Sequence, residues 1–172
     1  MDVIEAIKKR RSIRKYKDTP VSEEIINELL EAARLAPSAY NSQPCKFMVI
    51  TDREIFKKFK EEEVFTKEFI YSVPLIIVCL VVDDSYPSRA EDKFPLRDLA
   101  LEDISIASQN IVLRATELGL GSCYVGVMSR EKIRKVLNIP MKYIIPYVIT
   151  LGYSDETPGV RTLKSVNEIR FK

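Results

Sequence analysis

The chain has 172 residues, of which 46% are hydrophobic and 30% charged, and its formal net charge is +2. These values indicate a single folded domain, residues 1–172, with a buried core, and they exclude a disordered chain. A charge so near zero also argues against nucleic acid as the main partner, because duplex-binding domains usually carry a larger basic excess.

The numbers of histidines and cysteines restrict the kinds of active site that this chain can form. The chain contains no histidine, which excludes Ser–His–Asp triads, Cys–His pairs and HExxH zinc sites. Its three cysteines, Cys45, Cys79 and Cys123, show no CxxC spacing, so we predict neither a disulfide framework nor a metal site. No apolar leader follows a basic start, and the longest apolar run, residues 73–82, is too short to span a bilayer. We therefore expect a cytoplasmic protein with no membrane partner.

The first half of the chain predicts three helices and two strands. A short first helix places Val3, Ile4, Ala6 and Ile7 on one face. A second helix follows the N-cap Ser22 and ends at Pro37, and its apolar face comprises Ile25, Ile26, Leu29, Leu30 and Ala33. A strand over residues 46–51, a charged helix over 52–62 and a fully buried strand over 73–82 come next.

Helices and strands also alternate in the second half of the chain. The polar, proline-bearing segment 83–95 predicts a loop or lid, and residues 96–118 predict the longest helix. Its buried stripe comprises Leu101, Ile104, Ala107, Ser108, Ile111, Val112 and Ala115. Residues 121–127 predict a strand or turn, 129–139 a helix and 143–153 a strand, before a tail too polar to hold a core. Strands alternating with helices indicate an α+β or α/β domain.

A basic cluster, residues 8–17, lies between the first two helices and is called the basic segment below. If this segment is extended, Arg10, Ser12 and Arg14 point to one side and offer three donors to one anion. An isolated cluster of this kind is equally often a solvated helix end, where cations meet the negative end of the dipole. A targeting signal fits less well, because Ile13 and Tyr16 interrupt the charges and a helix follows directly.

Two further stretches are unusually rich in small and amide residues. "APSAYNSQPCKF", residues 36–47, carries more polar donors than a turn requires, although alone it resembles an ordinary connection. "GLGSCYVG", residues 119–126, is not a GxGxxG dinucleotide motif, but its glycines allow close approach to a flat ligand.

Together, "RRSIRKY", "APSAYNSQPCKF", "EDISIASQNIVLRATELGLGS" and "LGLGSCYVGV … IPYVITLGY" resemble the FMN-dependent nitroreductase family, with order and spacing intact from about residue 2 to residue 170. The resemblance implies an α+β fold with a central, mainly antiparallel sheet between helices. It also implies an intertwined homodimer with two FMN sites at the interface, in which the tail, about residues 157–172, reaches the partner subunit.

The same resemblance assigns the cofactor-binding residues. Arg10 and Ser12 would hold the FMN phosphate and ribityl end, with Arg11 contributing backbone, and Arg14 would lie near the flavin N1 and O2 edge. The ribityl chain and ring would be lined from the other subunit by Pro37, Ser38, Ala39 and Asn41. Backbone amides near flavin N5 and O4 would come from Tyr124, Val125 and Gly126, and Arg161 of the tail would reach the phosphate.

Two positions depart from the family pattern. Cys45 stands where many members have tryptophan, and Leu163 stands where a second basic tail residue is usual, with Lys164 as the nearest substitute. The resemblance implies an oxidoreductase that uses NADH or NADPH to reduce nitroaromatics, quinones or similar acceptors by a ping-pong scheme. The flavin would carry the chemistry, with no catalytic side chain and no metal. The alternatives are a flavin storage or sensor protein, a family variant with another specialised substrate, and a binder of nucleic acid or anionic surfaces.

Overall fold

The computed structural model describes residues 1–91 and 95–171. Within this part, four strands form one sheet: β1 (Cys45–Ile50), β2 (Leu75–Val81), β3 (Gly121–Val125) and β4 (Val148–Gly152). Their order is β1-β2-β4-β3, and each neighbouring pair is antiparallel. The α+β class with an antiparallel central sheet is therefore confirmed.

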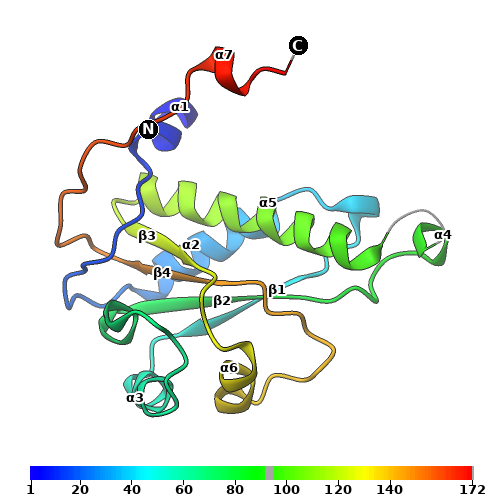
Figure 1. Cartoon of the computed structure of the whole chain (residues 1–172), viewed down its shortest axis with the longest axis horizontal. Helices are drawn as coiled ribbons and strands as arrows, with labels where there is room; N and C mark the ends of the chain where they lie inside the picture. The colour runs from blue at the N-terminus through cyan, green and yellow to red at the C-terminus, as the bar shows by residue number, and fades with distance from the viewer. Residues whose placement is uncertain (92–94, 172) are drawn as a thin grey trace.

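Helices cover both faces of the sheet (Figure 1). One face packs against α2 (Glu23–Arg34) and α5 (Leu96–Glu117), and the other packs against α3 (Arg53–Glu61) and α6 (Arg130–Leu137). Every residue of β2 is buried, and alternate side chains enter the two cores. This double burial explains why its sequence is a continuous apolar run without polar alternation.

Side-chain caps set where the helices begin. Ser22 Oγ accepts from the amide of Ile25 at 3.4 Å, and Asp52 accepts from the amide of Glu54 at 2.9 Å. The predicted N-cap of the second helix is thus confirmed. The first helix, α1 (Val3–Lys9), buries only Ala6 of its apolar face. Its remaining apolar side chains, Val3, Ile4 and Ile7, are exposed.

The last predicted strand is shorter than residues 143–153, because β4 begins only at Val148. Pro146 has no amide hydrogen for a ladder. The guanidinium of Arg130 also donates to the carbonyls of Ile145 at 2.9 Å and Pro146 at 2.8 Å. The predicted helix over 129–139 ends at Leu137, because Asn138 takes a left-handed C-terminal conformation, φ 53°.

Four segments have more structure than the sequence predicts. The segment 83–95 contains a short helix, α4 (Ser88–Glu91), and it buries Tyr86 and Ala90, so it is not a plain loop; residues 92–94 lie outside the described residues. Short 3-10 helices occur at η1 (Ala39–Asn41) and η2 (Glu68–Ser72). The tail carries α7 (Val166–Ile169), which a Ser165–Glu168 capping box begins. None of the described helices is both long and apolar enough to cross a membrane.

Candidate functional site

The basic segment lies along the edge of the sheet. Ser12 forms a parallel bridge with Ser122 of β3, the edge strand, and the amide of Ile13 donates to the Ser122 carbonyl at 2.9 Å. Ile13 is buried, whereas its neighbour Ser12 is half-buried and its neighbour Arg14 is exposed. The segment is therefore anchored by Ile13 and presents its polar side chains outward.

Tyr16 holds the other end of this segment. Its hydroxyl donates to the carbonyl of Ile13 at 2.6 Å and lies 2.9 Å from Thr150 Oγ1 on β4. Burial raises the pKa of Tyr16 far above its ordinary value, so the phenol stays neutral and remains a donor at physiological pH. The backbone of Lys17 adds a bond to the carbonyl of Tyr153 at 2.8 Å. The ends of the segment are thus tied to two strands.

Three predicted site residues converge on the thiol of Cys123. Burial raises the pKa of this thiol, while the charges of Arg14 and Arg10 and a hydrogen bond with Ser12 act in the opposite direction. Lys15 differs, because it pairs with Asp155 at 3.0 Å. Among the described residues, neither Arg10 nor Arg14 has an ion-pair partner. The solvated-helix-end alternative holds for Lys8 and Lys9, which are exposed in the last turn of α1. It does not explain why Arg14 lies beside Cys123 in the lining of one cavity.

A cavity of about 250 Å³ opens beside this cluster. Arg14 and Cys123 line it together with the end of β3, from Tyr124 to Gly126. A Cβ placed on Gly126 would meet no atom within 4 Å, so a flat ligand can approach this backbone closely. The structure therefore brings Arg14 and the predicted Tyr124, Val125 and Gly126 into one site.

Sequence reasoning missed the opposite wall of this cavity. Four residues from the η2 region line it: Thr66, Lys67, Phe69 and Ile70. They come close because Phe65 bridges to Met128, just beyond Gly126. The segment shows neither a recognisable motif nor a spacing pattern, so a single sequence offered no means of assigning it to the site.

The predicted residues of the 36–47 stretch lie elsewhere in the same chain. Pro37 and Ser38 line a second cavity of about 400 Å³, bounded by α2, β1 and α5. Ser38 Oγ accepts from the amide of Gln43 at 3.0 Å, and the amide of Ala39 donates to Asp103 at 3.0 Å. Asn41 is exposed in a left-handed turn. The two cavities share no lining residue, so one chain does not join the two predicted halves of the site.

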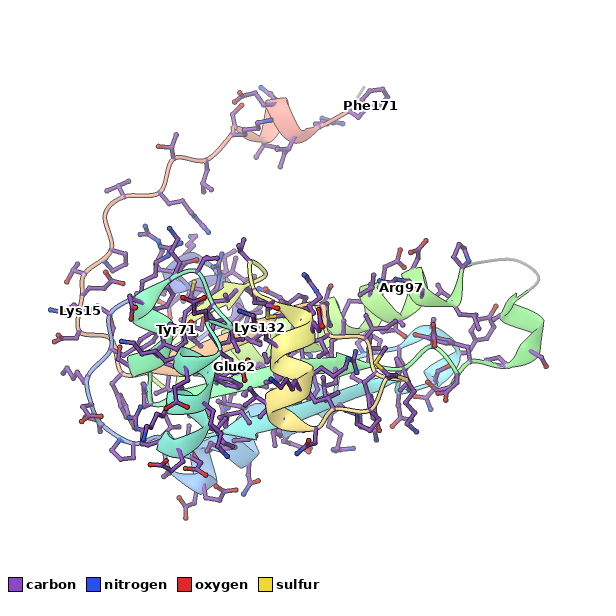
Figure 2. The ribbon with its side chains drawn as sticks, turned by 60° about the horizontal axis from the view of Figure 1, so that its bottom comes forward. Lys15, Glu62, Tyr71, Arg97, Lys132 and Phe171 are labelled. Carbon is purple, nitrogen blue, oxygen red and sulfur yellow. The ribbon has the colours of Figure 1, made fainter. Side chains whose placement is uncertain are left out.

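Arg11 contacts the start of the tail, and Arg161 is a residue of the tail itself. The Arg11 guanidinium donates to the carbonyl of Gly159 and thereby holds the start of the tail. Beyond that point the tail leaves the body, and its last described residue, Phe171, lies well away from the sheet (Figure 2). Arg161 is exposed and, within the described part of the chain, forms no ion pair. Within the described residues, no hydrogen bond or ion pair joins Arg161 to the basic segment of its own chain.

The hydrogen-bond donors of Arg10, Ser12 and Arg14 suit a ligand that carries both an anionic group and a flat ring. Guanidinium groups bind phosphate in two-point fashion, and a serine hydroxyl adds a further donor. An accessible strand backbone next to them offers amide donors to ring heteroatoms. With no histidine in the chain, the site has no imidazole base and favours chemistry that a bound cofactor carries.

Comparison with known families agrees with this geometry. The sequence profile of the Nitroreductase family matches residues 7–64 and 56–153. A protein of Methanothermobacter thermautotrophicus, provisionally named an NADH dehydrogenase/NAD(P)H nitroreductase, is 42% identical over the whole of this chain and 87% of its own length. A protein of Archaeoglobus fulgidus with the same provisional name is 39% identical over 88% of this chain and 85% of its own.

Solved structures show the same fold. A nitroreductase family protein of Clostridium difficile 630 superposes with a TM-score of 0.86 at 30% identity, over 99% of this chain and 98% of that one. A protein of Clostridium difficile R20291 described as an FMN-dependent nitroreductase superposes with a TM-score of 0.81 at 34% identity, over 98% of each chain.

Proposed function

Because the chain belongs to the nitroreductase family, we propose that it is an FMN-dependent oxidoreductase that uses NADH or NADPH to reduce nitroaromatics, quinones or similar acceptors. One observation supports this proposal above the others. Arg10, Ser12 and Arg14 gather without ion-pair partners in the described chain, next to a cavity that exposes the backbone of Tyr124 to Gly126. Such a site offers what a phosphate-bearing, planar cofactor requires.

In this proposal the basic segment binds the cofactor. Arg10 and Ser12 would hold the phosphate, and the backbone of Arg11 would support them. Arg14, which lines the cavity, would stabilise negative charge on the ring. Tyr124, Val125 and Gly126 would offer backbone amides to the ring.

The remaining cofactor contacts come from a second copy of the chain. Pro37 and Ser38 line a different cavity from Arg14, and Ala39 and Asn41 follow them in the same loop. A homodimer would bring the two halves of the site together. Arg161 on the partner's tail would likewise reach the phosphate. The exposed apolar side chains of α1 and of the tail are consistent with a surface that another copy covers.

When bound, FMN would supply the hydride and electron chemistry between the nicotinamide and the acceptor. The protein orients the ring, balances its charge and shapes the cavity. With no histidine in the chain, protons come from water or from the cofactor.

An absorbance scan of the purified protein tests the cofactor, and anaerobic titration with NADH and then NADPH tests the donor. We expect flavin absorbance that bleaches with one of the nucleotides and returns rapidly on adding a quinone or nitroaromatic. Flavin that bleaches but is not reoxidised by either acceptor would favour storage or sensing. A colourless protein that binds DNA in a salt-dependent manner would favour a nucleic-acid partner.

A further inference from the structure

A buried carboxylate lies beneath the loop that contains Ala39. Asp103 of α5 is only 4% exposed. Its two oxygens accept from the amide of Ala39 at 3.0 and 3.2 Å, and Oδ2 also accepts from the hydroxyl of Tyr86 at 2.7 Å. A carboxylate this deep in the protein is costly unless donors compensate it, so these bonds hold all three groups together.

The loop that Asp103 contacts is strained. Tyr40, Asn41 and Gln43 all have positive φ, at 55°, 54° and 48°, a region that side chains other than glycine rarely adopt. Each such residue is strained, so the loop needs contacts from outside to keep this shape. The bond from Ala39 to Asp103 supplies one where the loop begins.

Tyr86 connects a third segment to the same carboxylate. It precedes α4 and is 7% exposed. Burial and the neighbouring charge of Asp103 raise the pKa of Tyr86, so its hydroxyl stays protonated and keeps donating. The segment before α4 and the loop after α2 are therefore held by one shared acceptor on α5.

We propose that Asp103 is a positioning residue that keeps the Pro37–Asn41 loop in the shape required for cofactor binding, with Tyr86 orienting the carboxylate. The part that concerns the cofactor rests on the function proposed above. Asp103 acts on the loop through the amide of Ala39, and it also lines the cavity of about 400 Å³ together with Pro37 and Ser38. Removing the hydroxyl of Tyr86 therefore loosens the loop indirectly, because this hydroxyl donates to Asp103, which in turn holds the amide of Ala39.

The test uses Asp103→Asn, which keeps the shape but replaces one acceptor by a donor, and Tyr86→Phe, which removes only the hydroxyl. Tyr143→Phe is the matched control, because this half-buried tyrosine has no side-chain hydrogen bond within the described residues. Hydrogen–deuterium exchange on flavin-free protein is the first measurement. We expect residues 38–43 to exchange about tenfold faster in both variants, while β2 and the control are unchanged. Unchanged exchange over 38–43, or equal acceleration in β2, would overturn the inference.

The second measurement is the FMN dissociation constant, obtained by fluorescence titration. We expect both variants to bind FMN about tenfold more weakly and Tyr143→Phe to match the wild type. If the wild type binds no FMN, the proposed function fails, while the exchange result still decides the positioning role. If the wild type binds FMN and Asp103→Asn binds it equally well, the positioning role fails and the proposed function stands.

Discussion

The amide of Ile13 donates to the carbonyl of Ser122 at 2.9 Å, and this bond joins the N-terminal part of the chain to the edge strand β3. Ile13 also packs directly over Gly121, where an added Cβ would lie 2.7 Å from Ile13 Cγ1. The position of the basic segment therefore depends on a glycine that lies far from it in the sequence.

Replacing Gly121 by alanine should displace Ile13 and with it Arg10 and Arg14. We expect FMN to bind about tenfold more weakly, with some loss of thermal stability, because overpacking typically costs about 1–3 kcal/mol. Gly159→Ala is the control, since a Cβ there would meet no atom within 4 Å. Wild-type FMN affinity in Gly121→Ala would show that the segment is not held by this contact.

Replacing Arg10 or Arg14 by alanine should weaken FMN binding. A hydrogen bond to a charged group contributes roughly 1.5–3 kcal/mol, which corresponds to about 10- to 100-fold in the dissociation constant. Lys8→Ala removes the same charge from the exposed last turn of α1 and should leave FMN binding unchanged. Full flavin occupancy in the Arg10→Ala, Arg14→Ala double variant would contradict the assigned phosphate site.

The protein should be an obligate homodimer. The tail exposes a series of apolar side chains, which a second copy would cover: Val160, Leu163, Val166, Ile169 and Phe171. Light scattering should give twice the chain mass of 19.8 kDa. Ile169→Asp should lower the dimer fraction, and Asn167→Asp, which adds the same charge on the same short helix, should not. A flavin-bound monomer at low concentration would refute this prediction.

Thiol chemistry should contribute little to turnover. Burial raises the pKa of the Cys123 thiol and raises that of Cys45 to about 12, so both are neutral at pH 7. Steady-state kinetics of Cys45→Ser and Cys123→Ser should stay within about tenfold of wild type and remain ping-pong. Complete loss of activity in Cys123→Ser with FMN still bound would indicate a thiol-based mechanism.

Stability should decrease in alkali. Burial favours the neutral form of Cys45 in the folded state and raises its pKa from 9.0 to about 12. The unfolded chain releases this proton near pH 9 while the folded chain retains it, so the stabilisation is complete below pH 9 and is lost as the pH rises to 12. Chemical denaturation between pH 8 and 11 should show this decrease. Cys45→Ser should have a shallower pH dependence, and an identical slope would count against the assignment to Cys45.

The sequence alone determined the local features of this protein. The cap at Ser22, the apolar face of α2 and the buried run of β2 depend on residues close together in the chain, so their periodicity and capping groups could be recognised. The resemblance to a family added the order of motifs. One exception was the region before Val148, where Pro146 has no amide hydrogen and Arg130 binds the carbonyls of Ile145 and Pro146.

Only the tertiary structure decided which of these motifs meet. The sheet order β1-β2-β4-β3 leaves β3 at the edge, where the basic segment pairs with it and where the η2 region closes the cavity. The same packing places Asp103 under a strained loop that lies 64 residues earlier. These contacts join residues far apart in the chain, and their free energy comes from burial and long-range hydrogen bonds that no local pattern encodes.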